Sequence, residues 1–326
     1  MDWSKDNTDY RISYSRTDCN GYRDHQAFWG NKFYEKINLH PSKKLTITQI
    51  FSHSDYFQQN PEGLSIAQLD NHKQANPDAC PFNEYQKTNR STFGLLATYL
   101  INNNQDIHVS TYYSTWNYKE TSNRAAEYRT YSVPGASAQY HLHLGTGKIK
   151  NHISAGLDLK WQDINMYKLK SANDTLRVES IDETNIETNI MLANQIIAQR
   201  SIGAFVLYKL EIGKFNLLGS IRYDDMNNEL TNKMVALDSA KTTKDFTKIS
   251  ARLGASYTFS DAVIMFVNWS QGFMPPSTEE LANNPVGYSG FNTHLVPATS
   301  NCYEIGLRGF FKDKLFYELT GFIMNT

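Results

Sequence analysis

The feature that most limits the fold of this chain is a strict alternation of apolar and polar residues over ten or more positions. In the segment 153–161, Ile153 and Trp161 share one parity, while Asp158 and Lys160 share the other. Side chains of a β-strand point alternately to its two faces, so this pattern predicts strands whose faces meet different media. Strands of soluble sheets are about five or six residues long. Strands of about ten residues are long enough to cross a bilayer at a tilt of about 45°.

Charged residues of the clearest strands lie almost entirely on the parity opposite the apolar one. They are Asp158, Lys160, Lys209, Arg222, Arg252, Glu304, Arg308 and Glu318. An Arg or Lys on a lipid-facing side costs roughly 2–4 kcal/mol at the bilayer midplane. We therefore expect Asp158, Arg222, Arg252, Glu304 and Arg308 on the concave face of a curved sheet. The convex, lipid-facing set is predicted to be Phe93, Leu95, Tyr99, Ile153, Leu157, Val206, Leu253, Val267 and Leu307.

Connections between the predicted strands alternate between short turns and long polar loops. The turns include residues 102–105, 145–148 and 211–214, and the loops cover residues 55–89, 120–129, 168–199 and 225–245. Outer-membrane barrels have short periplasmic turns and long extracellular loops. We count about 13 strands, and an odd number cannot close an antiparallel barrel. The predicted fold is all-β: an antiparallel up-and-down transmembrane β-barrel, incomplete, with both sheet edges open.

Composition agrees with a membrane barrel. Aromatic residues make up 13% of the 326 residues, with 20 Tyr, 17 Phe and 5 Trp. Barrels need such residues for the aromatic girdles at the two membrane interfaces. No run of 18 apolar residues occurs, which excludes a transmembrane helix. The net charge of −1, with no basic cluster, argues against nucleic acid as a partner.

A group of motifs lies towards the C-terminal end of the chain. In order, they are the strand 263–271, Gly272-Phe273-Met274-Pro275-Pro276, Glu280-Leu281, Asn284-Pro285, Leu295-Val296-Pro297 and Tyr303-Glu304-Ile305-Gly306-Leu307. This order resembles the late-barrel segment of TonB-dependent outer-membrane receptors, which import ferric siderophores and similar scarce ligands. Ala298 stands where that family usually has a Glu. The segments Asn60–Leu64 and Gln74–Pro77 resemble a loop of the siderophore-receptor branch.

The resemblance implies a 22-stranded barrel in the outer membrane of a Gram-negative bacterium, filled by an N-terminal plug and driven by TonB. Residues 1–326 would then be a partial barrel domain without plug, signal peptide or closing strands; the first residues lack the apolar region of a signal peptide. The implied partners are a ferric siderophore, outer-membrane lipid, the TonB complex and the plug. Iron would be carried by the ligand, so we expect no cofactor of the protein's own.

The motif residues are interpreted as structural, because they identify the family without contacting ligand. They are Gly272, Phe273, Pro275, Pro276, Glu280, Leu281, Pro297, Tyr303, Glu304 and Gly306. Pro opens a helix readily, and Ser277 with Glu280 has the spacing of a capping box. We therefore expect a short helix after Pro276.

The ligand-binding candidates are aromatic and basic residues on the polar parity. Tyr112, Trp116 and Tyr118 could form a stacking platform for a ferric chelate near the barrel mouth, or serve as girdle and loop-packing aromatics. Arg222 and Arg252 could attract an anionic chelate, or pair with the plug or with lumen carboxylates.

Other chemistries find little support. His141 and His143 share a face, a spacing compatible with metal binding, but no third ligand is evident nearby, so no metal site is predicted. Neither a G-x-S-x-G motif nor a Gly-rich phosphate loop occurs, so we expect no enzyme. Cys19 and Cys80 either pair across outer loops or remain free thiols. The alternative function is a passive porin-like or adhesin-type barrel.

Overall fold

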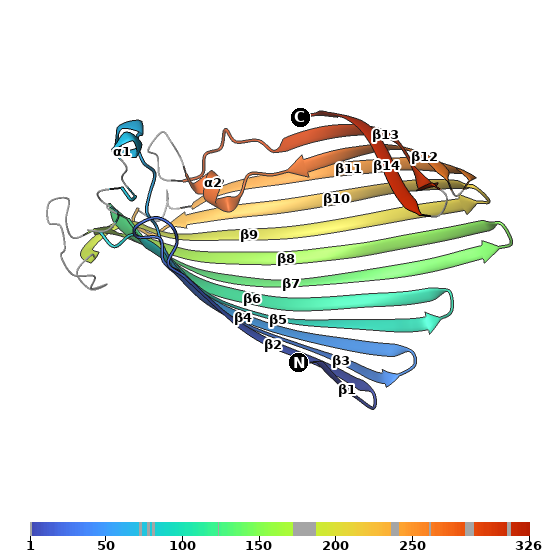
Figure 1. Ribbon diagram of the computed structural model, residues 1–326, viewed down its shortest axis with the longest axis horizontal. Helices are drawn as coiled ribbons and strands as arrows, with labels where there is room; N and C mark the ends of the chain where they lie inside the picture. Colours follow the sequence, from blue (N-terminus) through green and yellow to red (C-terminus); the bar gives the residue numbers. More distant parts are fainter. Residues whose placement is uncertain are drawn as a thin grey trace.

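Each strand of this protein is hydrogen-bonded to the strands that precede and follow it in the sequence, and together they form one curved antiparallel sheet of 14 strands (Figure 1). The computed structural model describes residues 2–326 except 72–73, 77–78, 80–81, 123, 172–186, 236–240, 261, 284–289 and 312–313. Short hairpin turns lie at one end of the sheet and the longer connections at the other (Figure 1).

The strands are β1 (Asp2–Lys5), β2 (Thr8–Cys19), β3 (Phe28–Ser42), β4 (Leu45–Gln59), β5 (Tyr85–Asn102), β6 (Gln105–Thr121), β7 (Ala125–Thr146), β8 (Ile149–Ser171), β9 (Glu187–Ile212), β10 (Phe215–Asn232), β11 (Lys241–Ser260), β12 (Val263–Met274), β13 (Ala298–Phe311) and β14 (Leu315–Asn325). Two five-residue helices lie in the long connections: α1 (Ile66–Asp70) and α2 (Thr278–Ala282). Neither described helix is long enough to cross a membrane.

The predicted up-and-down sheet with open edges is confirmed, with β1 and β14 at its two edges. The strand count differs slightly, because 14 strands are present where about 13 were expected. The additional strand is β1, which pairs with β2 from Asp2↔Arg11 to Lys5↔Thr8. Four residues are too few to display an alternating pattern, so β1 could not be seen in the sequence.

The predicted division of residues between two faces agrees with the observed register. Ile153 pairs with Tyr208, and Leu253 pairs with both Gly219 and Trp269, so the apolar parity continues from strand to strand. Arg222 on β10 reaches Asp158 on β8, with Nη1 and Oδ2 2.7 Å apart. The two side chains meet above Gly203 on β9, where an added Cβ would lie 2.1 Å from Arg222 Nη2. Side chains two strands apart converge in this way on a concave face.

The long loops are shorter than predicted, because the strands continue beyond the alternating segments. The loop expected over 55–89 is reduced to 60–84, and the loop expected over 120–129 is a tight connection between β6 and β7. Likewise β8 extends to Ser171 and β9 begins at Glu187. Strand β10 extends to Asn232, and β11 begins at Lys241. Hydrogen-bonded pairing therefore continues where the apolar pattern has already ended.

The outward residues of β6 show why the pattern ends early. Ile107, Val109 and Tyr113 face outward near the short-turn end, whereas Thr115 and Asn117 occupy the same face farther along. The apolar band thus covers only part of each strand, a length close to that needed for one tilted crossing. The remainder of β6 carries polar residues on its outer face, while Trp116 and Tyr118 lie on its concave face, which suits a wall that continues above the membrane.

Aromatic rings cover glycines at several places on the concave face. An added Cβ would lie 2.3 Å from the Tyr112 ring at Gly135, 2.6 Å from Phe205 at Gly156 and 2.3 Å from Phe266 at Gly306. In each case, the ring occupies the space above the neighbouring strand that a side chain would need. Gly306 of the Tyr-Glu-x-Gly-Leu motif therefore has a packing reason to be glycine.

Replacing Gly306 with Val should destabilise the sheet by roughly 1–3 kcal/mol, because Phe266 and the backbone at Leu319 O, 2.9 Å from the added Cβ, both crowd the site. The matched control is Gly321→Val on β14, since an added Cβ there meets nothing within 4 Å. Urea unfolding of both variants measures the difference. Equal losses of unfolding free energy would show that Phe266 does not require the glycine.

Candidate ligand-binding site

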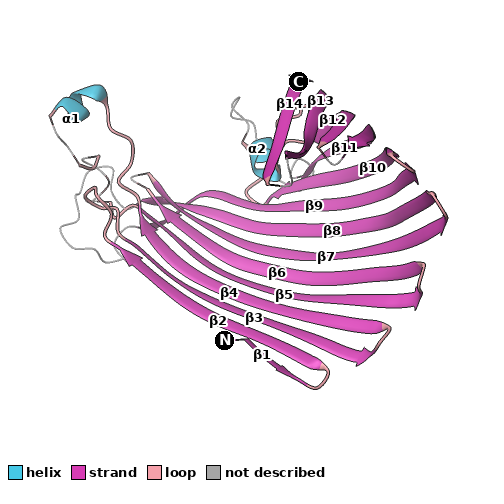
Figure 2. Ribbon diagram, turned by 45° about the vertical axis from the view of Figure 1, so that its right-hand side comes forward, coloured by secondary structure: helices cyan, strands magenta, loops and turns pink. Residues whose placement is uncertain are grey.

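Helix α2 packs against the concave face near the end of the sheet that carries the long connections (Figure 2). Leu281 of α2 is fully buried among apolar side chains that come one each from neighbouring strands. These are Tyr131 of β7, Ile164 of β8, Ile197 of β9, Leu230 of β10 and Phe246 of β11, together with Phe291. The residues of β7 to β10 are paired in register, so they form a continuous apolar row across the wall.

Polar contacts attach the same helix to β7 and β8. Glu279 Oε1 accepts a hydrogen bond from Tyr131 Oη at 2.6 Å and forms an ion pair with Arg129 Nη1 at 2.7 Å. Gln162 Nε2 lies 3.5 Å from Thr278 Oγ1. The segment after β12 is thereby anchored to strands more than 110 residues earlier in the chain, since Gln162 and Thr278 are 116 positions apart and Tyr131 and Glu279 are 148.

The expected short helix is present, and it begins at a complete capping box. Ser277 Oγ accepts from the Glu280 backbone N–H at 3.1 Å, and Glu280 Oε2 accepts from the Ser277 N–H at 2.7 Å. This local bonding satisfies backbone donors that a five-residue helix would otherwise leave free. It also directs Leu281 towards the wall.

The other motif residues occupy the strands and connections around α2. Phe273 packs partly buried against the apolar row, and Gly272 lies opposite Ser300 on β13. Pro275 and Pro276 link β12 to α2, and Pro297 directly precedes β13. Tyr303 pairs with Trp269, while Glu304 faces the concave side, where Asn268 Nδ2 lies 3.3 Å from its Oε2. Asn284 and Pro285 lie outside the described residues.

A cavity of about 510 Å³ lies between α2 and strands β7 to β9. Its lining combines charges of both signs with apolar side chains: Glu127, Arg129, Ile164, Met166, Lys168, Gln195, Ile197, Ser277, Glu279, Glu280, Ala282 and Asn283. Arg129 bridges Glu127 and Glu279, and Lys168 Nζ lies 3.4 Å from Glu127 Oε2. Such a lining offers donors, acceptors and an apolar shelf to a polar organic ligand.

The predicted aromatic platform is partly occupied by neighbouring side chains. Trp116 stacks on Tyr131, with ring centroids 4.1 Å apart and planes 13° apart, and Arg90 lies 4.8 Å from the Trp116 ring centre. Arg90 and Tyr131 come from the strands on either side of β6, so they flank Trp116 from both sides. Tyr118 lies beneath Arg129, and Tyr112 covers Gly135. Contact of these three aromatics with ligand stays a prediction.

The two predicted arginines differ in their surroundings. Arg222 pairs with Asp158 and with Asp224, whose Oδ1 lies 2.8 Å from Nη2. Arg252 is exposed and has no ion-pair partner among the described residues. Of the two, Arg252 is the cation left available to an anionic molecule on the concave face.

The connection between β4 and β5 folds back on the neighbouring loop. Arg23, between β2 and β3, donates to Gln74 O at 2.7 Å and to Glu62 O at 2.8 Å. His25 Nε2 lies 2.8 Å from Glu84 O, and burial lowers the pKa of the His25 imidazole, which favours the neutral ring. These contacts hold the base of the connection, while α1 projects from the end of the sheet (Figure 1).

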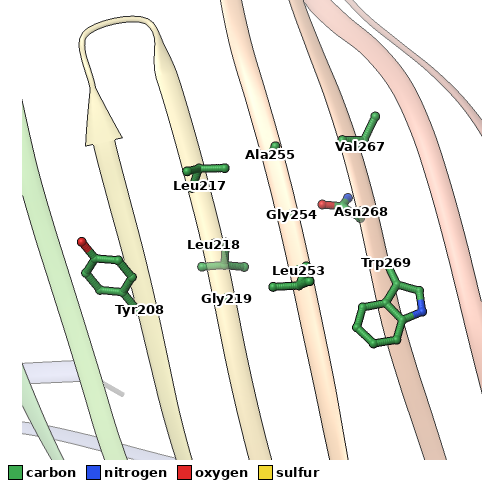
Figure 3. Close-up of a pocket in the computed structure, with 10 residues that line it drawn as sticks. All are labelled: Tyr208, Leu217, Leu218, Gly219, Leu253, Gly254, Ala255, Val267, Asn268 and Trp269. Carbon is green, nitrogen blue, oxygen red and sulfur yellow. The ribbon is translucent and has the colours of Figure 1, made fainter.

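The groove drawn in Figure 3 lies on the opposite face and is not part of this site. It measures about 540 Å³ and is lined on the apolar parity by Tyr208, Leu217, Gly219, Leu253, Ala255, Val267 and Trp269. The small residues Gly219 and Ala255 leave space between the larger side chains. A groove of this composition on the lipid-facing side suits acyl chains.

The expectation that His141 has no third ligand nearby was wrong, because Asp106 and His108 offer ligand atoms beside it. They come from β6, 33 or more positions earlier, and only strand register brings them there. Cys19 is exposed and forms no disulfide with any described residue; its pairing with Cys80 stays a prediction, since Cys80 is not described.

A family model described as "TonB dependent receptor-like, beta-barrel" matches residues 3–326, which is almost the whole chain. The chain belongs to the TonB-dependent receptor family. Its members are outer-membrane proteins of Gram-negative bacteria, and the family comprises transporters and receptors, not an enzyme class. The resemblance drawn from the motifs around Gly272 and Tyr303 is thereby confirmed.

Solved receptor structures share the fold at low sequence identity. The ferric citrate transporter FecA has a TM-score of 0.83 at 15% identity, over 99% of this chain and 47% of its own. Fiu of E. coli K12, a ferric-catecholate import receptor, has a TM-score of 0.77 at 16% identity, over 98% and 54%. PiuA of Acinetobacter baumannii, a siderophore receptor, has a TM-score of 0.74 at 12% identity, over 98% and 53%. The chain therefore spans about half the length of each of these receptors.

Four residues around α2 of this receptor were not predicted from the sequence as site residues. They are Glu127, Arg129, Tyr131 and Glu279. Their weak sequence signal was the alternation Glu127, Arg129, Tyr131, which places one acid, one base and one aromatic on the same face of β7. Nothing in the sequence indicated that Glu279, on a helix after β12, would meet them.

Proposed function

We propose that this receptor binds and imports a scarce ligand, most specifically a ferric siderophore, with energy supplied through TonB. Membership of the family supports transport across the outer membrane. The structurally similar proteins FecA, a ferric citrate transporter, Fiu, a ferric-catecholate import receptor, and PiuA, a siderophore receptor, favour a ferric chelate as the ligand. Membership of the family also implies a plug domain and an interaction with the TonB complex, and both are part of this proposal.

The observation that carries the proposal is the cavity beside α2. It lies on the concave side, at the end of the sheet that carries the long connections, and both acidic and basic groups line it. A siderophore presents carbonyl, hydroxyl and charged oxygens around its metal, and these need donors such as Arg129 and Lys168. The ligand-binding roles of Tyr112, Trp116, Tyr118, Arg222 and Arg252 belong to the same proposal.

The projecting helix α1 offers a direct test of ligand capture. Ile66 and Leu69 are 80% and 62% exposed, three residues apart, and so lie on one side of the helix. Burying one such side chain against a ligand contributes roughly 1.5–3 kcal/mol. The double variant Ile66→Ser/Leu69→Ser should therefore weaken ferric-siderophore binding at least tenfold and slow growth under iron limitation.

The control variant is Lys43→Ser, in the exposed turn between β3 and β4 at the opposite end of the sheet. Whole-cell binding of the ferric siderophore and surface abundance are measured for both variants. Exposed substitutions change stability by about 0.5 kcal/mol or less, so abundance should remain normal. Unchanged affinity and growth at normal abundance would contradict capture by α1 and favour the passive-barrel alternative.

A further inference from the structure

We propose that Asp106, His108 and His141 form a binding site for a divalent transition-metal ion of the zinc type on the concave face. The three residues offer one ligand atom each, and these atoms all lie within 4.8 Å of one another. Two imidazoles and one carboxylate are ligands that Zn²⁺ takes readily. This metal site is separate from the proposed siderophore site, because it lies near the short turns and the siderophore cavity lies beside α2.

Strand register assembles the group. Asp106 and His108 are two residues apart on β6, so both point to the concave face, and Asp106 is paired directly with His141 of β7. Short turns lie close by, since β6 begins at Gln105, just before Asp106, and β7 ends at Thr146, five residues after His141. Both strands are paired with neighbours on either side here, with a regular register between β6 and β7 and a register shift on β5, between Leu100 and Asn102, next to Asp106.

The outer contacts of the two imidazoles favour metal binding. His108 Nδ1 lies 3.0 Å from Thr98 Oγ1 of β5, and His141 Nδ1 lies 2.8 Å from Ser154 Oγ of β8. Metal-binding histidines usually have their second ring nitrogen bonded in this way, which orients the ring. The Nε2 atoms of both rings would then be the ligand atoms, and an ion would replace the present contact of His108 Nε2 with Asp106 Oδ2 at 2.7 Å.

Only a small contraction would be needed to close the group on an ion. Ligand atoms at about 2.0–2.1 Å from a tetrahedral Zn²⁺ lie about 3.3 Å from one another. Side-chain rotation can supply this change, since the His108 side chain is 36% exposed. A fourth position would stay open to the lumen for water or for His143, whose Nε2 lies 3.7 Å from Asp106 Oδ1.

Two more histidines, His143 and His152, lie close to the site. His143 Nδ1 lies 2.7 Å from His152 Nδ1 on β8, and His152 Nε2 lies 3.7 Å from Glu211 Oε1 on β9. Only one of the two facing Nδ1 atoms can carry the proton of that hydrogen bond. The ion would thus sit at one end of a row of histidines and carboxylates that extends across four strands, from β6 to β9.

Binding of Zn²⁺ to the purified receptor, without a polyhistidine tag and after metal removal, tests the proposal by calorimetry. We expect one tight Zn²⁺ per receptor and no comparable binding of Mg²⁺. His108→Ala and His141→Ala should each remove the tight site. Thr98→Val, which removes only the outer contact of His108, should weaken the affinity roughly 10- to 100-fold.

The matched control is His40→Ala. His40 has the same outer arrangement, with Nδ1 3.2 Å from Thr46 Oγ1 and Nε2 3.1 Å from Asp9 Oδ2, but no second described histidine joins it in a group of three ligands. This variant should keep the tight Zn²⁺. Heat-modified mobility on gels confirms that each barrel is assembled. No tight Zn²⁺ in the unaltered receptor, or equal loss in His40→Ala and His141→Ala, would overturn the site.

Discussion

Substituting Leu253 by Arg is expected to lower the free energy of unfolding of the receptor in a bilayer by roughly 2–4 kcal/mol. Leu253 is 58% exposed on the lipid-facing parity of β11. Its neighbours on the same face, Gly219 of β10 and Trp269 of β12, are uncharged, so no partner there can receive a guanidinium. Arg would have to carry its charge into hydrocarbon or bend away from the strand.

The control for this substitution is Ser256→Arg, three residues away on the opposite parity of the same strand. Ser256 lines the polar concave cavity that also includes Glu304, Glu318, Lys209 and Arg308, so a guanidinium there remains hydrated among charges of both signs. Its effect should stay below about 1 kcal/mol. Urea unfolding in phospholipid vesicles compares the two variants. Equal destabilisation would mean that the faces are misassigned, since a shift of one residue exchanges them.

Shortening Leu281 to Ala is expected to cost about 2–5 kcal/mol in the docking of α2, the range for a fully buried leucine. Leu281 is 0% exposed and is the apolar side chain by which α2 enters the row of Ile164, Ile197 and Leu230. Because the helix itself has only five residues, its packing and not its propensity maintains it. Loss of docking should appear as faster amide hydrogen exchange over residues 277–283.

For the amide-exchange measurement, and not for ligand binding, Leu69→Ala is the matched control for Leu281→Ala. Leu69 lies in α1, a helix of the same length that also starts at a capping box, but it is 62% exposed. The substitution should change amide exchange in α1 little, because no buried contact is lost. The Leu281 variant should also weaken ligand binding, since Glu279 and Glu280 of α2 line the cavity. Unchanged exchange in both variants would contradict docking through Leu281.

Much of the fold could be predicted from local pattern alone. The parity of residues such as Leu157 and Arg222 was visible because the side-chain period of a strand is two, whatever it pairs with. The limits of the strands were less visible. Beyond the membrane band, residues such as Thr115 and Asn117 are polar on the outer face, so backbone pairing continues without a sequence signal.

The candidate site was predictable only in its parts. The capping box of Ser277 and Glu280 is local, and the sequence shows it directly. The docking of that helix is not local. Tyr131 and Glu279 meet only because the sheet curves and brings the connection after β12 over the face of β7.

The two-faced strands, the alternation of short turns and long loops, and the receptor family could all be predicted from the chain, because they depend on residues near one another in it. The meetings of distant side chains could not: Arg129 with Glu279, Arg222 with Asp158, and Asp106 with His141 come together only in the folded sheet. Strand register and sheet curvature set these contacts. Both result from hydrogen bonding and packing across the whole wall, which no short segment of sequence contains.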